Sequence, residues 1–308
     1  MRKYMIGGGA VIACLVGVLL FRGCNAETVE LALRLQASDV REVVVAIDTN
    51  TAVTAKEGEQ RVKSRIEIPW TFRVDAVDVD GALRMTVTYG KVTLGETVTK
   101  GGKTTIPFQT MAGPNPLKQI SDLVQAESFT VEIAPDGTIR SVSGIDAIVE
   151  KLKAETVFPD VAGRKTISKR DREKLLEGFL RQFAEPAVRS LMQIFLSVYP
   201  GEPVTQGSTW TRKGPGDPGR ALREERQITL MKHDGDTSTL ALTSTFASDD
   251  PDRVELNSAR IQGTALLDAA TGWVMRLEIN HESTYLYRSE PDATIREHAL
   301  TIVETAPW

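Results

Sequence analysis

The amino-acid sequence predicts an α+β protein: two predominantly antiparallel, curved β regions with a central helical segment, after an N-terminal signal or anchor. Residues 27–110 and 200–308 are rich in β-branched side chains separated by turn sequences, as strands require. Residues 168–199 instead repeat apolar side chains at helical spacing. The expected organisation is residues 1–26 as signal or anchor, 27–165 as a β-rich half with two short helices, 166–199 as the helical segment, and 200–308 as a C-terminal antiparallel β half.

The N-terminus has the pattern of an export signal. Arg2 and Lys3 precede an uninterrupted apolar run from Met5 to Phe21, and "RGCNAE" follows. The run has about 17 residues, at the low edge of what spans a bilayer. Three outcomes stay open: cleavage after Ala26, lipidation at Cys24, or retention as a membrane anchor with its basic residues on the cytoplasmic side. Each outcome places the rest of the chain outside the cytoplasm, in the periplasm or cell envelope.

Composition and charge exclude some function classes. The chain has 308 residues, of which 41% are apolar and 25% charged, which is ordinary for a folded soluble protein. Its net charge of -4 disfavours a role in binding nucleic-acid backbones, which needs a basic face. Both cysteines, Cys14 and Cys24, precede the expected body of the protein. We therefore expect neither disulfides nor thiol chemistry there.

In the first half, the strand-like runs include "REVVVAID" and "IEIPWTFRVDAV". Pro69 interrupts the second run, so we expect that strand to be an edge strand or to carry a bulge. Asn115 followed by Pro116 predicts the capped start of a short helix.

The stretch "FTVEIAPDGTIRSVSGIDAIVEKL", residues 129–152, predicts a strand, a turn, a second strand and a helix. Residues 135–137, Pro-Asp-Gly, are typical of a tight turn. Ser143 with Asp146 three residues later resembles a capping box, with Asp in place of the usual Glu. The apolar positions that follow repeat at helical spacing: Ile145, Ile148, Val149 and Leu152.

In the central segment, Pro186 is expected to break or kink the helix. The following "VRSLMQIFLSVY" is apolar on nearly all sides, so it should be deeply buried or should face something apolar. In the C-terminal half, "GTALLDAATGWVMRLEI" repeats the strand, turn and strand plan of residues 129–152.

Three blocks carry a resemblance to a known family. They are "FTVEIAPDGTIRSVSGIDAIVEKL", "VTQGSTWTR" with Gly207 and Trp210, and "GTALLDAATGWVMRLEI". In this order they resemble a bacterial domain-of-unknown-function family of exported proteins and lipoproteins, from about Glu27 to the C-terminus. The resemblance implies an exported, β-rich, two-part body and no established activity. Many members have a cleaner lipidation box than the one around Cys24. The architecture is also similar to the half-barrel of lipoprotein carriers, although a fold does not imply a function.

Candidate chemical groups are few. His281 and His298 with Glu282 and Glu297 contain the ligand types of a zinc site. However, neighbouring residues of a strand point to opposite faces, so one compact site is hard to build. The acidic stretch 249–255 lacks the ligand spacing of a calcium loop. The sequence therefore predicts no catalytic, cofactor or metal residues.

A set of aromatic residues is the candidate lining of an apolar cleft between sheet and helices: Trp70, Phe72, Phe179, Phe183, Phe195 and Trp273. The alternative is that they are plain core. Cys24 is the candidate lipid attachment site.

The leading functional hypothesis is a non-catalytic, extracytoplasmic binding or carrier-like module for a lipid, another apolar ligand or an envelope protein. One alternative is an extracytoplasmic hydrolase that uses carboxylates, for which we expect two buried acids with raised pKa in a pocket. The other is a structural or assembly module of the cell envelope, for which we expect a large exposed apolar face or a paired edge strand.

Overall fold

The computed structural model describes residues 27–56, 58–105, 115–156, 176–178, 180–216, 222–252, 254–289 and 292–306. Its strands form a single sheet of 13 antiparallel strands. The strands are β1 (Val40–Ala55), β2 (Gly58–Val77), β3 (Leu83–Tyr89), β4 (Thr93–Lys100), β5 (Lys103–Thr105), β6 (Ser128–Ile133), β7 (Ile139–Ser143), β8 (Thr209–Lys213), β9 (Leu222–His233), β10 (Thr237–Ser248), β11 (Val254–Asp268), β12 (Val274–Tyr287) and β13 (Thr294–Thr305). The described helices include α2 (Pro116–Val124), α3 (Ile145–Glu155) and α5 (Glu185–Leu196).

The two predicted β regions are the two halves of one continuous sheet. The strand order is β7-β6-β3-β2-β1-β13-β12-β11-β10-β9-β8, and β4 pairs with β2 and β5 beside this path. The halves join where β1 pairs with β13, from Val43 opposite Thr305 to Thr54 opposite Thr294. Local sequence patterns predict strand-rich regions, but they do not report which strands from opposite ends of the chain will pair.

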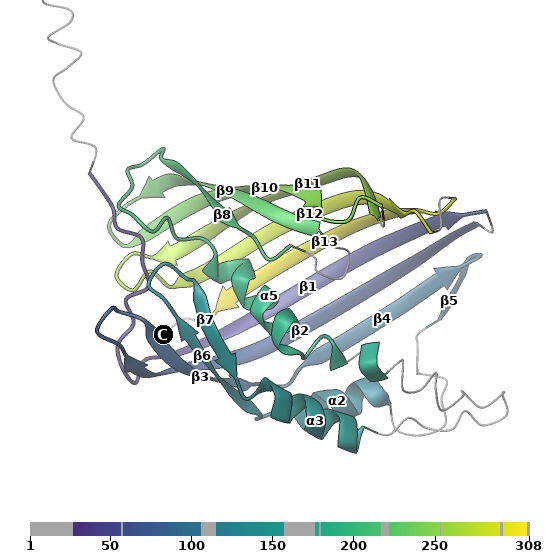
Figure 1. The fold of residues 1–308 in the computed structure, drawn as a ribbon, viewed down its shortest axis with the longest axis horizontal. Coiled ribbons are helices and arrows are strands. Elements are labelled where there is room, and N and C mark those ends of the chain that lie inside the picture. The colour runs from purple at the N-terminus through teal and green to yellow at the C-terminus, as the bar shows by residue number, and fades with distance from the viewer. Residues whose placement is uncertain are drawn as a thin grey trace, which may run out of the picture.

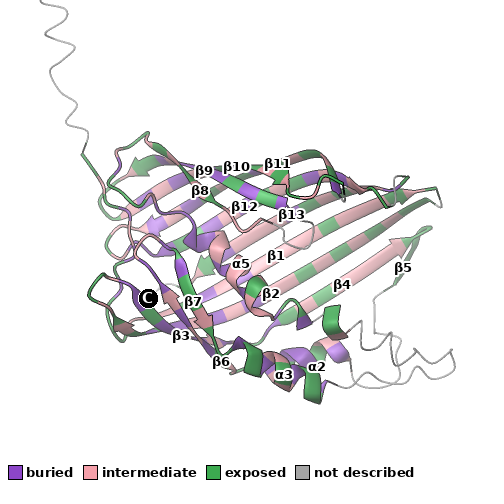
Figure 2. Ribbon diagram, in the orientation of Figure 1, coloured by how far each residue is buried: buried purple, intermediate pink, exposed green. Residues whose placement is uncertain are grey.

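The sheet is curved, and α5 crosses its concave face while α2 and α3 lie at one margin (Figure 1). Side chains that point toward α5 alternate with side chains that point outward along each strand, as the period of two requires. Burial is concentrated around α5 and at one end of the sheet (Figure 2). The other end extends past the core, and neither residues 47–55 of β1 nor residues 58–67 of β2 include a buried residue.

The core at the covered end is aromatic. Phe72 lies at its centre, in edge-to-face contact with Trp70, Phe195 and Trp273 at ring-centroid distances of 6.1, 6.1 and 5.5 Å. Each of these four side chains is buried. Aromatic pairs in this geometry add about 0.5–1.5 kcal/mol beyond the burial of their area. The cluster therefore fixes α5, which carries Phe195, against strands of both halves of the sheet.

The N-terminal segment closes this covered end. The backbone N–H of Leu33 donates to Pro135 in the β6–β7 turn, and that of Arg34 donates to Thr271 in the β11–β12 turn, both at 2.8 Å. The segment buries Leu31, Leu33 and Leu35 beneath it. The first described residues therefore bridge turns that belong to opposite halves of the sheet.

The two outer strands of the main strand order, β7 and β8, are short, and side chains cover them. β7 and β8 have five residues each. Arg189 of α5 donates to the Ile139 carbonyl of β7 at 2.8 Å. Arg212 of β8 donates to the carbonyl and the carboxylate of Asp136, at 2.6 and 2.9 Å. Short, covered edges of this kind present little free backbone to another chain.

Several local predictions are confirmed. Residues 135–137 form the turn between β6 and β7, where Gly137 has φ of 77° and the Asp136 carboxylate accepts the Thr138 N–H at 3.0 Å. Asn115 caps α2 by accepting the Leu117 N–H at 2.9 Å. The apolar segment that follows Pro186 is buried against the sheet along one helix face.

One local prediction is wrong, and the prediction for the strand of Pro69 is confirmed in one of its two alternatives. Ser143 does not cap α3, because it ends β7 opposite Thr130, and Gly144 is the N-cap with φ of 92° and no side-chain bond. Pro69 lies in an interior strand rather than an edge strand, and β2 carries the expected irregularity, which falls between Val74 and Ala76. The Pro69 carbonyl accepts the Gly90 N–H at 2.8 Å. The N–H that proline lacks would lie on the same side of the strand as this carbonyl, at the break between β3 and β4. The interior strand tolerates proline there because no ladder bond is lost.

Candidate apolar binding pocket

The sheet contributes an aliphatic floor to a pocket beneath α5. Ile47 of β1 pairs with Ile66 of β2, and Ile66 pairs with Leu94 of β4, so the three side chains form one row across the concave face. All three are only partly buried, although they adjoin the core. They lie just beyond the point where the closely packed end of the sheet gives way to its open end.

Helix α5 contributes the facing wall. Its buried stripe comprises Val188, Met192, Phe195 and Leu196. Leu191 and Ile194 lie three residues apart on a neighbouring face and are only partly buried. Because the helix is apolar over more than one stripe, one face packs into the core and the next is left facing the row of Ile47, Ile66 and Leu94.

The pocket between helix and sheet has a volume of about 570 Å³. That lies within the roughly 300–1,000 Å³ range of small-molecule sites in proteins. Its lining comes from β1, β2, β4, α5, the turn before α5 and residues 215–216 after β8, and Arg181 is the only charged residue among the described residues that line it. The pocket can thus exclude water from an apolar group while meeting one charge at its rim.

The aromatic residues predicted from the sequence occupy different places. Four of them, Trp70, Phe72, Phe195 and Trp273, form the core of the covered end rather than the pocket wall. Phe183 is buried and also lines the pocket. Phe179 and Cys24 lie outside the described residues, so lipidation of Cys24 stays a prediction.

Sequence reasoning missed the aliphatic residues that line the pocket. Ile47 and Ile66 follow the alternation of ordinary core positions in their strands, and nothing local marks the point where cover by α5 stops. The available signal was in α5, because the sequence predicts that its apolar surface is wider than one packing stripe needs. Leu191 and Ile194 are that surplus surface.

A buried ion pair holds the C-terminal end of α5. Arg226 of β9 donates to the Glu224 carboxylate through Nε at 3.0 Å and Nη2 at 2.9 Å. Its Nη1 donates to the Ile194 carbonyl at 2.8 Å and to Ser197 Oγ at 3.3 Å. A cation at a helix C-terminus also interacts favourably with the helix dipole. Sequence reasoning missed this pair, although Arg226 lies two residues before Ile228 on the same strand face.

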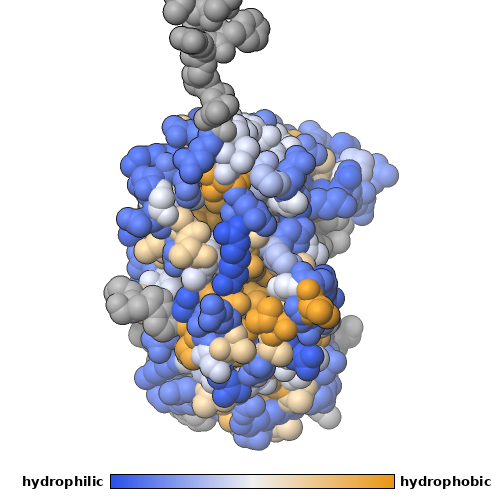
Figure 3. Space-filling view, turned by 90° about the vertical axis from the view of Figure 1, so that its left-hand side faces the viewer, coloured by the Kyte–Doolittle hydropathy of each residue, from blue (hydrophilic) through white to orange (hydrophobic). Residues whose placement is uncertain are grey.

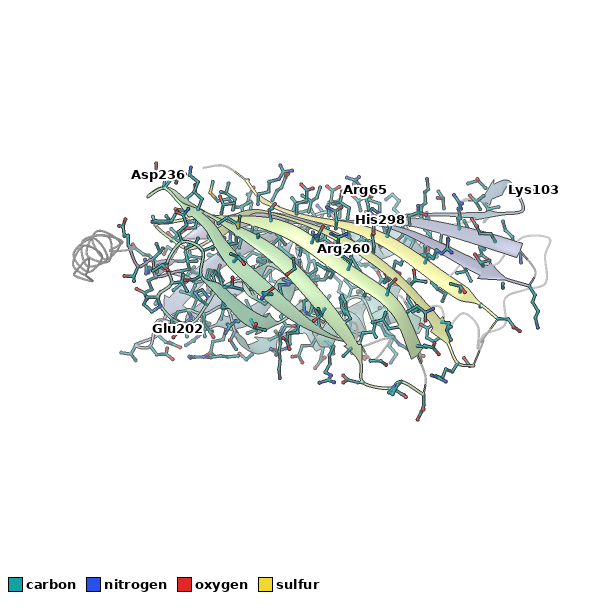
Figure 4. All side chains as sticks on the ribbon, turned by 90° about the horizontal axis from the view of Figure 1, so that it is seen from above. Arg65, Lys103, Glu202, Asp236, Arg260 and His298 are labelled. Atoms are coloured by element: carbon teal, nitrogen blue, oxygen red, sulfur yellow. The ribbon has the colours of Figure 1, made fainter. Side chains whose placement is uncertain are left out.

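The histidines and neighbouring acids do not converge. His281 pairs with Ala299 and faces the concave side, where its ring stacks on Phe246 at 5.4 Å. His298 pairs with Glu282, and Figure 4 shows His298 with Arg65 on the side of the sheet away from α5. The prediction that His281 and Glu282 point to opposite faces is therefore confirmed. Within the described part of the chain, no three His, Cys, Asp or Glu residues lie close enough to hold a metal ion.

The acids with a shifted pKa are made stronger rather than weaker. Hydrogen bonds from Arg140 lower the pKa of Asp80, and those from Lys232 lower the pKa of Asp234. Burial raises the pKa of Asp136, but hydrogen bonds from Arg212 and Thr138 outweigh it and leave that pKa below its ordinary value. No carboxylate is among the described residues that line the pocket under α5.

Large apolar side chains are exposed at few places in the described part of the chain: Val77, Val79, Met231 and Met275. Figure 3 views the covered end and shows apolar surface gathered near its centre among hydrophilic side chains. None of the described helices is both long enough and apolar enough to span a membrane.

A family model matches residues 80–274, more than half of the chain. The chain belongs to DUF6263, a family of unknown function. This DUF6263 match confirms the expected resemblance to a domain-of-unknown-function family, whereas the likeness to lipoprotein carriers stays a prediction. The curated proteins include no match to the chain.

Solved structures similar to the DUF6263 chain share little sequence with it. A lipovitellin structure, whose title concerns lipid–protein interactions, is 10% identical with a TM-score of 0.49 and covers 89% of this chain. The chain spans 26% of that structure's length. DynF of Micromonospora chersina is 6% identical over 90% of this chain and 85% of its own, with a TM-score of 0.18. OccK7 of Pseudomonas aeruginosa is 7% identical over 87% of this chain and 100% of its own, with a TM-score of 0.21. Likenesses of this size carry no argument about what this chain binds.

Proposed function

We propose that the protein is a non-catalytic, carrier-like module that binds the acyl chain of a single-chain amphiphile in the pocket under α5. The observation that carries the proposal is the row of partly buried aliphatic residues Ile47, Ile66 and Leu94 facing Leu191 and Ile194 across about 570 Å³. Partly buried aliphatic side chains that face one another across a space gain free energy when an apolar group fills it.

A slender ligand suits this space better than a folded partner. The curved sheet bounds the pocket on one side and α5 on the other, so only a narrow group can contact both walls. Each methylene removed from water contributes about 0.8 kcal/mol. Roughly 5 to 19 buried methylenes are then needed to offset an association cost of about 4–15 kcal/mol. The ligand we propose is accordingly a long acyl chain rather than a short one.

The proposal places this binding outside the cytoplasm, because residues 1–26 have the pattern of an export signal or anchor. A carrier in an aqueous envelope compartment must shield an acyl chain from water, which is what the pocket walls would do. The export signal supports this location, and fractionation of cells that produce the full chain would test it.

Filling the pocket tests the proposal directly. Ala187 of α5 lines the pocket, so Ala187→Phe should occupy the space that the acyl chain needs. Thr264→Phe is the matched control, because Thr264 is exposed on the outer face of β11. Each full-length protein is purified from its own envelope, its lipids are extracted, and native mass spectrometry measures the bound mass.

We expect a stoichiometric single-chain amphiphile with the wild-type protein and with Thr264→Phe, and loss of most of it with Ala187→Phe. A bare wild-type protein, or equal lipid on all three proteins, would refute the proposal. Recovery of a bound polypeptide in place of lipid would instead assign the pocket to a protein partner and would also overturn it.

A further inference from the structure

Among the described residues, the rim of the pocket carries one charged side chain, and it has no ion partner. Arg181 lines the pocket, and its backbone N–H donates to the Glu177 carbonyl at 3.0 Å. No ion pair between described residues includes its guanidinium, whereas Arg189, two turns further along, pairs with Glu185 at 2.8 Å. The side chain of Arg181 is therefore available to an anion from solution.

Arg181 also separates the pocket from a second hollow. That hollow, of about 620 Å³, lies between α3 and residues 176–184, and Arg181 and Ala184 line both spaces. The second hollow has charged side chains of both signs, with Glu150, Lys153 and Glu177 in its lining. Of these two spaces, the one under α5 combines an aliphatic interior with one cationic side chain among the described residues of its lining.

The geometry points to an anionic head group on the ligand, with Arg181 as the residue that selects it. This inference rests on the proposed function. An amphiphile that buries its acyl chain must leave its polar head at the rim, and the described residues of the rim offer a guanidinium rather than a carboxylate. Guanidinium binds carboxylate or phosphate oxygens in a bidentate manner, which lysine does less well. A cationic head would meet the same guanidinium as a repulsive neighbour.

The exposure of Arg181 sets how strongly the pocket should prefer an anionic head group. Arg181 is exposed, so solvent and salt screen its interaction with an anion. Exposed charge pairs contribute little, and a bidentate pair contributes more, so we expect about fivefold tighter binding of an anionic head over an uncharged one. The preference should fall as the salt concentration rises, while binding of the acyl chain itself should not.

Three amphiphiles with one chain length test the inference: dodecanoate, dodecanol and dodecylammonium. Each competes with the uncharged dye N-phenyl-1-naphthylamine for the full-length protein, and dye fluorescence reports displacement. Arg181→Gln removes the charge, Arg181→Lys keeps it without the bidentate geometry, and Arg260→Gln is the control on an exposed arginine of β11.

For the wild-type protein and Arg260→Gln we expect dodecanoate to bind about fivefold more tightly than dodecanol, and dodecylammonium to bind most weakly. Arg181→Gln should bind dodecanoate and dodecanol equally, and Arg181→Lys should be intermediate. Unchanged selectivity in Arg181→Gln, or equal binding of all three amphiphiles by the wild-type protein, would overturn the inference and leave the proposed function standing. If none of the three displaces the dye, the proposed function falls and the inference falls with it.

Discussion

Arg226 is the residue whose replacement tests most sharply how α5 is held against the sheet. Its side chain is 2% exposed and joins β9 to the last turn of α5 through Ile194 and Ser197. Arg226→Met keeps most of the side-chain length and removes the charge and all of its donors. The Glu224 carboxylate then stays buried, with the Ser244 hydroxyl at 2.6 Å as its closest remaining donor.

The expected loss is about 3–5 kcal/mol of unfolding free energy. Removing one partner of a buried ion pair costs that much because the remaining charge has no counter-ion and has lost its water. A domain is stable by only about 5–15 kcal/mol, so the loss is a large fraction of the total. For a protein of this size the midpoint of thermal unfolding should fall by roughly 5–8 °C.

Urea unfolding followed by tryptophan fluorescence measures the loss, since Trp70 and Trp273 lie in the core that α5 covers. Arg223→Met is the control, because Arg223 pairs with Asp249 at the surface and should contribute less than about 1 kcal/mol. The double variant Glu224→Leu/Arg226→Met should recover most of the loss, since no unpaired charge remains. A loss below about 1 kcal/mol in Arg226→Met would show that the pair does not hold α5.

Two further predictions concern the β6–β7 turn. Gly137→Ala should cost more than about 2 kcal/mol in urea unfolding, because φ is 77° and the added Cβ would lie 1.9 Å from the Leu196 carbonyl oxygen. Gly207→Ala, with φ of 87° and no atom within 4 Å of its Cβ, should cost only about 1 kcal/mol, and equal losses would contradict this reading. The pKa of Asp136 is lower in the folded protein than in the unfolded chain, so its ionised carboxylate stabilises the fold. This stabilisation is complete above the unfolded pKa of about 3.9 and is lost as pH falls through the lower folded pKa. Asp136→Asn should therefore flatten the pH dependence of stability below about pH 4, and an unchanged profile there would show that the pair with Arg212 is not responsible.

Features that depend on neighbouring residues were predictable from the sequence. The turn at residues 135–137 and the cap at Asn115 each use side chains that bond to backbone within a few residues, so the pattern contains the whole interaction. The cap of α3 was mispredicted because it does not depend on neighbouring residues alone. Pairing with β6 keeps Ser143 in a strand.

Features that depend on distant residues were not predictable. Nothing near Val43 identifies Thr305 as its partner, and the join between the two halves of the sheet follows from that pairing. Arg226 and Glu224 look like surface charges until the curvature of the sheet brings the end of α5 over them. The pocket was also not predictable from nearby sequence. Ile47 and Ile66 differ from core residues only because they lie where α5 stops covering the sheet.

The strands that are made first and last are neighbours inside the sheet, and strands made midway lie at its margins. The first strand and the last strand of the chain, of 16 and 12 residues, meet inside the sheet, whereas the strands made midway, β7 and β8, form its short outer margins. Until β13 has been made, β1 has one long side with unpaired backbone groups, and such a side can recruit a strand from another molecule. Pairing across such a long stretch of chain is also slow. The last twelve-residue strand thus acts as the closing element of folding, and a chain that stops short of it should accumulate as aggregates rather than as a smaller folded domain.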